Sequence, residues 1–375
     1  MIVPREVTEH SPLSALDEYP IQQLPRPIRI VETTDARAYN RYWFSVLDRA
    51  GEVYMVTGFG VYPNLDTREA YAIVVNDGTH STVTIRGLLG DNPANIRCGP
   101  WHAEVIEPFR QWRLTLDPNE SPIGFDLHWR DTKRAVFQQL GAPGVASAEG
   151  RPRLSSAGYE TFGSIEGTIT CNGRTFDLEY GRTRGSRDHH WGARDGVGGR
   201  AFMEPTSRIS HCGQWIEFDD WAIWGQRHLY NLGDDRLSAG RVAKMEYKLR
   251  FDPITHHLLG GVITNTLDSG DVKEIHYEQI GTQVAYLRCG GYPGITSGSP
   301  DDDLYHGMYV GDDEISFRID DVTDPEVRVH LAGFDDHLCS ARCGDETTVA
   351  TLECRNPLVY EMCRDGVPGF TFLDD

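Results

Sequence analysis

Residues 53–61 read Val-Tyr-Met-Val-Thr-Gly-Phe-Gly-Val, a run of β-branched and aromatic side chains that stops at Tyr62-Pro63-Asn64. Such residues fit the half-buried, pleated surface of a sheet, and proline and asparagine are typical of the turn that ends a strand. Residues 70–75, Ala-Tyr-Ala-Ile-Val-Val, follow closely and lead into the turn Asn76-Asp77-Gly78. The stretch therefore predicts neighbouring strands of a sheet.

The same pattern repeats along both halves of the chain. Short apolar runs with turn residues between them are typical of a sandwich or barrel when they recur about every 8–12 residues. Asn172-Gly173 separates two such runs and is a strong hairpin signal. No phosphate-binding loop is present, and Gly196-Val197-Gly198-Gly199 lacks the strand–helix setting of a dinucleotide fingerprint. Later runs that we interpret as strands include 214–224, 242–251, 257–264, 272–279, 315–319 and 327–331. We therefore predict an all-β fold.

Residues 138–158 interrupt this pattern. The stretch 141–150, Gly-Ala-Pro-Gly-Val-Ala-Ser-Ala-Glu-Gly, is small, flexible and punctuated by proline and glycine, as linkers are. A chain of 375 residues is long enough for two domains, each with its own core. We expect an N-terminal β domain at 1–140, a linker at 141–158 and a C-terminal β domain at 159–375.

Composition narrows the classes of function. The net charge is −20, whereas a protein that neutralises nucleic-acid phosphates needs a basic face. The first residues carry proline and charges where a signal peptide needs an apolar core, and no run approaches the roughly 20 apolar residues of a membrane span. We expect a cytoplasmic protein with no nucleic-acid partner and no membrane span, and whether it forms a homodimer stays open.

The cysteines do not predict disulfides or a metal centre. Thiols stay reduced in the cytoplasm, so the eight cysteines are not expected to pair. Cys339 and Cys343 form a C-x-x-x-C spacing, but the second tight Cys/His pair that structural zinc usually requires does not accompany it. We expect buried free thiols and no metal.

Residues 186–195, Ser-Arg-Asp-His-His-Trp-Gly-Ala-Arg-Asp, are dense in ionisable groups and form the candidate site. In an extended strand, alternate side chains share a face, so Asp188 and His190 point the same way. The opposite face takes Arg187, His189 and Trp191. Adjacent histidines are therefore poorly placed to ligate one metal together. The pattern favours a carboxylate–imidazole pair of Asp188 with His190, and a salt-bridged structural contact between the domains is the alternative.

Further candidates surround this segment. Tyr62 ends a strand beside Pro63 and is placed to offer its hydroxyl to a bound substrate, and Glu204 is either a second acid or the partner of Arg194. Aromatic side chains suit a pocket for a flat or polyene ligand, although each also fits an ordinary barrel core. The residues that we expect to contact substrate are His189, Trp191, Arg194, Tyr42, Trp43, Phe59 and Tyr71.

The motif R-D-H-H-W-G-x-R-D at residues 187–195 resembles the carotenoid 1,2-hydratase (hydroxyneurosporene synthase) and AttH-like group of two-domain lipocalin-type proteins. Residues 58–64 (GFGVYPN) and 107–113 (EPFRQWR) look like the same group's N-terminal pattern, and the resemblance spans most of residues 40–280. It implies two lipocalin-like β-barrels packed side by side, with an apolar ligand at or near their interface.

The resemblance also implies a chemistry. The group includes hydratases of isoprenoid double bonds, and its relatives include fungal pericyclases. We expect a lyase or hydratase without cofactors that acts on a hydrophobic isoprenoid or phenolic molecule. Asp188, His190, Tyr62 and Glu204 would be its catalytic residues. An alkene needs an acid that burial keeps protonated, whereas a phenol needs a base. A pericyclase of a polyene and a carrier that leaves its hydrophobic ligand unchanged are the alternatives.

Overall fold

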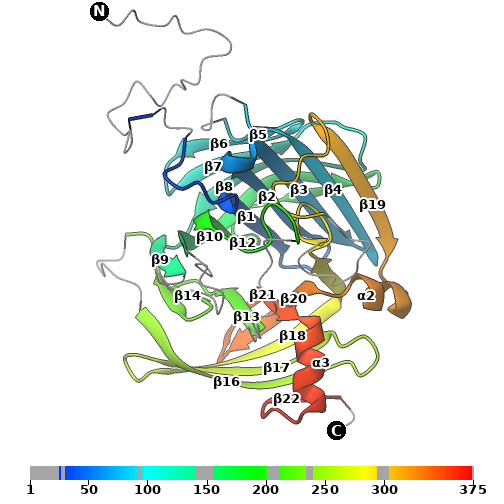
Figure 1. Cartoon of the computed structure of the whole chain (residues 1–375). Helices are drawn as coiled ribbons and strands as arrows, with labels where there is room; N and C mark the ends of the chain where they lie inside the picture. Colours follow the sequence, from blue (N-terminus) through cyan, green and yellow to red (C-terminus); the bar gives the residue numbers. More distant parts are fainter. Residues whose placement is uncertain are drawn as a thin grey trace, which may run out of the picture.

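A computed structural model describes residues 25–26, 30–90, 95–140, 155–200, 212–233, 240–293 and 304–373. These residues form two large curled sheets with little helix (Figure 1). The all-β, two-domain prediction is confirmed. None of the helices within these ranges has the length and hydropathy needed to span a membrane.

The first sheet curls into a half-barrel (Figure 1). Its main path runs in the order β19-β4-β3-β2-β1-β12-β10-β8-β7-β6-β5, and β9 and β11 pair with β10. A short 3-10 turn, η2 (Pro63–Leu65), follows the second strand. The strands are β1 (Ala38–Asp48), β2 (Tyr54–Tyr62), β3 (Thr67–Asn76), β4 (Thr79–Leu88), β5 (Arg97–Cys98), β6 (Trp101–Glu107), β7 (Gln111–Leu116), β8 (Ile123–Asp131), β9 (Val136–Leu140), β10 (Ser155–Cys171), β11 (Arg174–Leu178), β12 (Thr183–Ala193) and β19 (Glu314–Asp321).

The second sheet runs in the order β15-β14-β13-β21-β20-β18-β17-β16-β22, and a further pairing of β15 with β16 closes it into a ring. Two helices accompany it, α2 (Pro325–Leu331) and α3 (Asn356–Arg364), and α3 packs Val359 and Cys363 into the core of this sheet. The strands are β13 (Cys212–Glu217), β14 (Trp221–Trp224), β15 (Arg227–Tyr230), β16 (Gly240–Phe251), β17 (Leu258–Leu267), β18 (Val272–Tyr286), β20 (Phe334–Cys343), β21 (Glu346–Arg355) and β22 (Phe370–Phe372).

The two sheets divide the chain differently from the predicted domain boundaries. Strands β10, β11 and β12 follow residues 141–158 in sequence but belong to the first sheet, and β19 returns from the second half to pair with β4. The limits 1–140, 141–158 and 159–375 therefore stay a prediction for domains and do not mark the division between sheets. Strand β12, which carries the candidate site, lies between β1 and β10 in the middle of the first sheet.

Two local sequence signals can be checked directly. Asn172 and Gly173 join β10 to β11 in an antiparallel hairpin, with φ angles of 50° and 78°.

Residues 327–331, predicted as a strand, instead lie in helix α2. Asp324 accepts a hydrogen bond from the amide of Glu326, and Pro325 stands at the helix start. An N-cap aspartate followed by proline is a helix-start signal, and here it outweighs the apolar alternation.

The sheets meet through an apolar layer. It combines side chains of β1, β2 and β3 with side chains of β14, β18 and β20, so the two sheets share a core. Its largest members are Trp43, Trp224, Tyr54, Tyr71 and Tyr292.

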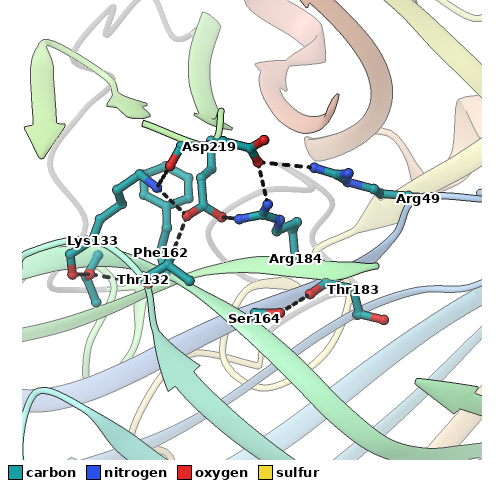
Figure 2. Close-up of polar contacts among 10 residues, drawn as sticks. Arg49, Thr132, Lys133, Phe162, Ser164, Thr183, Arg184 and Asp219 are labelled. Carbon is teal, nitrogen blue, oxygen red and sulfur yellow. Dashed lines mark hydrogen bonds and ion pairs between the residues drawn. The ribbon is translucent and has the colours of Figure 1, made fainter. Parts of the chain in front are cut away.

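An ionic cluster that is buried at Lys133 and Glu217 also joins the sheets at the start of β12 (Figure 2). Lys133 Nζ, just after β8, lies 2.8 Å from Glu217 Oε1 of β13, and both side chains are almost completely buried. Arg184 of β12 lies 3.1 Å from Glu217 Oε2 and 2.8 Å from Asp219 Oδ1, and Arg49 approaches Asp219 as well. Glu217 binds both Lys133 and Arg184, and its removal would leave the buried charge of Lys133 uncompensated, so Glu217 fixes β12 relative to the second sheet.

Candidate functional site

Strand β12 presents two faces of different character. Residues directly opposite on antiparallel strands share a face. Asp188 stands opposite Trp43 of β1 and Glu160 of β10. Because Trp43 belongs to the layer between the sheets, this face, which we call the acid/base face, looks toward the second sheet. His190 shares it, as the alternation predicted.

The other side of β12, which we call the barrel face, looks into the half-barrel. His189 stands opposite Tyr42 and Tyr159, and Tyr42 packs against the core of the first sheet. Arg187 on this face is completely buried and binds both carboxylate oxygens of Asp131, at 2.9 and 2.6 Å. Its charge is therefore fully paired inside the half-barrel.

On the acid/base face, His190 lies between two carboxyl groups. Its Nε2 atom is 3.0 Å from Glu160 Oε1, whereas its Nδ1 atom is 3.7 Å from Asp188 Oδ2. A separation of 3.7 Å is too long for a hydrogen bond. The carboxylate that orients the ring is therefore Glu160, and not Asp188 as the sequence pattern favoured. The side chains of His190 and Asp188 are 17% and 18% exposed, so a small molecule can contact both groups.

Burial and neighbouring charges shift the pKa of all three groups. Burial raises the pKa of Asp188 above its ordinary value, against the opposing effect of His190. Burial also raises the pKa of Glu160, although its hydrogen bond with His190 opposes the change. Burial alone would lower the pKa of His190, but Asp188 and Glu160 outweigh it and the net shift is upward. All three shifts favour the protonated forms, so the cluster holds its protons to a higher pH than the free side chains would.

Two glycines make room on the acid/base face. A Cβ atom at Gly158 would collide with the ring of His190, which lies flat over that position. A Cβ atom at Gly60 would stand 2.8 Å from both Arg41 Cγ and the hydroxyl oxygen of Tyr62. The absence of side chains at these positions lets long polar groups lie across the sheet.

A second polar cluster lies on the same face and is completely buried. Tyr62 donates a hydrogen bond of 2.5 Å to Glu69 Oε1, and His306 Nδ1 lies 2.5 Å from the same oxygen. The Tyr62 hydroxyl, which we expected to be offered to a substrate, is thus engaged by Glu69. Burial lowers the pKa of His306 to about 3, so its ring is neutral. Beside it, Arg41 donates a 3.0 Å hydrogen bond to the hydroxyl of Tyr292.

The barrel face borders a cavity of about 470 Å³. His189 stacks on Tyr42 with ring centroids 4.0 Å apart, and its Nε2 atom lies 2.6 Å from Asn40 Oδ1. Burial lowers the pKa of His189 to about 3, so the ring is neutral at ordinary pH. This arrangement suits a neutral apolar ligand and not proton transfer. The side chains that line the cavity include Asn40, Tyr42, Phe59, Val61, Leu89, Ile96 and Trp191.

The predicted site residues therefore separate into two groups. Asp188, His190, Trp43, Tyr71, Tyr62 and Arg194 belong to the acid/base side, where the Arg194 guanidinium lies 6.0 Å from the ring centroid of Tyr292. His189, Trp191, Tyr42 and Phe59 belong to the barrel side. Glu204 lies outside the described residues. Within the described ranges, no group of three His, Cys, Asp or Glu side chains is arranged to hold a metal ion.

Sequence reasoning missed the partners that complete the acid/base face. Glu160, Arg41, Glu69 and His306 come from β10, β1, β3 and a loop after β18, and no local motif marks them. One usable signal was present: the alternate glycines at 58 and 60, which predict a crowded face of β2.

Residues 13–230 match the sequence model of a family of unknown function, DUF8625. No curated protein matches the chain. Among solved structures, the chain is similar to an AttH-like protein of Nitrosomonas europaea, with 12% identity, a TM-score of 0.40 and coverage of 90% of this chain and 98% of that one. It is similar to kievitone hydratase of Nectria haematococca, with 12% identity, a TM-score of 0.37 and coverage of 87% and 93%. It is also similar to CghA, with 10% identity, a TM-score of 0.45 and coverage of 85% and 88%. At these scores the similarities carry no argument about activity.

Proposed function

We propose that this chain, which belongs to DUF8625, a family of unknown function, is a cofactor-independent lyase or hydratase that acts on a hydrophobic small molecule. One observation carries the proposal. The imidazole of His190 lies between Glu160 and Asp188 in a largely buried setting, while the ring and Asp188 remain partly exposed. Perturbed pKa values cluster at functional sites, where catalysis requires an acid or base tuned by its surroundings.

The three groups divide the proton transfers of a hydration between them. Glu160 accepts the hydrogen bond from Nε2 and positions the ring, which leaves Nδ1 on the side of Asp188. His190 in its protonated form gives the Nδ1 proton to an alkene carbon, and Asp188 takes a proton from the water that adds. That proton returns from Asp188 to His190 and closes the cycle, and the reverse sequence removes water. General acid–base catalysis of this kind contributes roughly 10²–10⁴-fold.

An apolar wall adjoins Asp188. Trp43 stands directly opposite Asp188, and its ring centroid lies 6.2 Å from that of Trp224 and 6.4 Å from that of Trp215. Such a wall suits an aromatic or isoprenoid substrate, and its low polarity strengthens the interactions of the nearby charges.

Small molecules that co-purify with the protein, identified by mass spectrometry, provide the substrate candidate for the test. Turnover is then compared between the wild type and Asp188→Asn, which is nearly isosteric but cannot take up a proton. We expect the variant to lose roughly 10²–10⁴-fold in rate. A pericyclase, in which these groups only polarise the substrate, would keep most of its rate and would contradict the proposal.

A second function, binding without turnover, is favoured by the cavity on the barrel face. Its apolar wall and the neutral His189 beside it suit a carrier of a hydrophobic ligand. Recovery of the same unchanged molecule from the wild type and from Asp188→Asn, with no product in either, would support the carrier instead of the enzyme.

A further inference from the structure

Arg41 of β1 is a buried cation beside the acid/base pair. It stands directly opposite His190, and it is 4% exposed. Its terminal nitrogen donates to the Tyr292 hydroxyl, but its Nε atom has no hydrogen-bond partner, and within the described ranges it makes no ion pair with a carboxylate. A buried charge is normally paired and fully hydrogen-bonded, because removing it from water is costly.

Arg187, a second buried arginine, differs from Arg41 in how its charge is compensated. Arg187 is equally buried on the other face of the same sheet, yet both oxygens of Asp131 bind its guanidinium, and Tyr159 accepts a further hydrogen bond. The fold therefore provides a carboxylate where an arginine has a purely structural role. Arg41 lacks that carboxylate in the described part of the chain.

The carboxyl groups around Arg41 do not fully compensate it. Glu69 is held by Tyr62 and His306 and also faces Arg86, with its Oε2 atom 3.8 Å from Arg86 Nε. Burial raises the pKa of the remaining acids that face this region, which favours their neutral forms. These acids are Asp188, Glu160, Asp336 and Glu353, the last with a pKa of about 7.

Two further hydrogen-bond donors, Arg194 and Tyr71, lie near Arg41. Arg194 lies on the ring of Tyr292 with Arg41, their guanidinium carbons 6.0 and 4.9 Å from its centroid. The hydroxyl of Tyr71 is completely buried and has Tyr292 as its hydrogen-bonding neighbour. It lies over Gly58, two residues along β2 from the glycine that makes room for Arg41, so the two groups are neighbours on the sheet.

We propose that the substrate carries an oxygen acid (a carboxylate, enolate or phenolate) and that Arg41 binds this oxyanion together with Arg194 and the Tyr71 hydroxyl. The inference rests on the proposed function and defines its substrate class, because a plain hydrocarbon would leave Arg41 uncompensated. The bound oxyanion would lie next to His190, which stands opposite Arg41, and would favour the protonated imidazole, so that binding prepares the acid.

The test compares two probes that differ in charge, cinnamate and cinnamamide, by calorimetric titration of the full chain at neutral pH. We expect cinnamate to bind at least roughly 10-fold more tightly, as one charge-assisted hydrogen bond contributes. Arg41→Gln should abolish this preference, and Tyr71→Phe should reduce it. Arg113→Gln, which alters an exposed pair with Asp126, is the control and should keep it.

Equal binding of the two probes by the wild type, or an unchanged preference in folded Arg41→Gln, would overturn the proposal. If Arg41→Gln does not fold, Arg194→Gln replaces it as the test, because the Arg194 side chain is half-buried and lies at the ring of Tyr292. An unchanged preference in folded Arg194→Gln would then overturn the proposal. Loss of the preference in Val61→Trp, which fills the barrel cavity, would also overturn it, since the anion would then bind there. If Asp188→Asn keeps its turnover while the probe preference stands, the proposed function fails and the oxyanion site does not.

Discussion

The two faces of β12 differ in how their charges are compensated. On the barrel face, Asp131 binds Arg187 and His189 is neutral. The apolar cavity on this face therefore lies beside groups that carry no uncompensated charge. On the acid/base face, His190 shares its surroundings with two carboxyl groups and Arg41 has no carboxylate partner among the described residues. Neighbouring positions of one strand thus lie in different surroundings, and the proposed function assigns ligand burial to one side and proton transfer to the other.

The largest expected effect separates two adjacent histidines. If the acid/base face performs the chemistry, His190→Gln should lower turnover of the identified substrate roughly 10²–10⁴-fold. His189→Gln should change it far less, because that ring is neutral and stacks on Tyr42 on the barrel face. Steady-state rates of the two variants provide the measurement, and a larger loss in His189→Gln would place the chemistry on the barrel face.

How far the sequence predicts this site depends on which information is local. The alternation of residues 186–195 predicted the two faces, because the period of a strand depends on backbone geometry alone. The identity of Glu160 as the partner of His190 was not predictable, since the two residues are 30 positions apart and the pairing register depends on tertiary packing. His306 is still more remote, 237 positions after Glu69. The apolar run 327–331 was wrongly predicted as a strand because the residues that start its helix, Asp324 and Pro325, lie outside the run.

The next effect concerns stability on the barrel face. Arg187→Gln leaves Asp131 buried without its cation, and breaking such a pair typically costs about 3–5 kcal/mol of unfolding free energy. Arg113→Gln breaks an exposed pair with Asp126, and exposed pairs contribute about 0–1 kcal/mol. Urea unfolding of both variants measures the difference. Similar losses for the two would show that Arg187 is not the paired structural charge described here.

The cavity on the barrel face predicts an intermediate effect on ligand binding. Val61 lines the cavity and is buried, so the indole of Val61→Trp should occupy space that an apolar ligand needs. Binding of the neutral fluorescent probe N-phenyl-1-naphthylamine should weaken by roughly 10-fold, equivalent to about 1.4 kcal/mol. Asp188→Asn, on the other face, should bind the probe normally. Unchanged binding in Val61→Trp would place the probe elsewhere.

The smallest effect is a pH dependence of stability. Because burial raises the pKa of Asp188, the native state holds this proton more tightly than the unfolded chain does. The free energy of unfolding therefore falls as pH rises from the ordinary carboxyl value through the raised one. Asp188→Asn removes this loss, so its stability relative to wild type should be greater at pH 8 than at pH 4. Thermal unfolding at both pH values measures it, and the opposite trend would contradict a raised pKa.

The ring pKa values of His189 and His190 test the central claim most directly, because the two residues are adjacent in sequence and lie on opposite faces. NMR titration of the protein with ¹⁵N-labelled histidine, assigned with His189→Gln and His190→Gln, measures both. We predict that His190 titrates above 6.5 and that Glu160→Gln lowers its pKa, since Glu160 supplies its hydrogen bond. His189, with a pKa of about 3, should stay neutral throughout the range in which the protein is folded. Titration of both rings together near 6.5, or protonation of His189 at a higher pH than His190, would contradict the account.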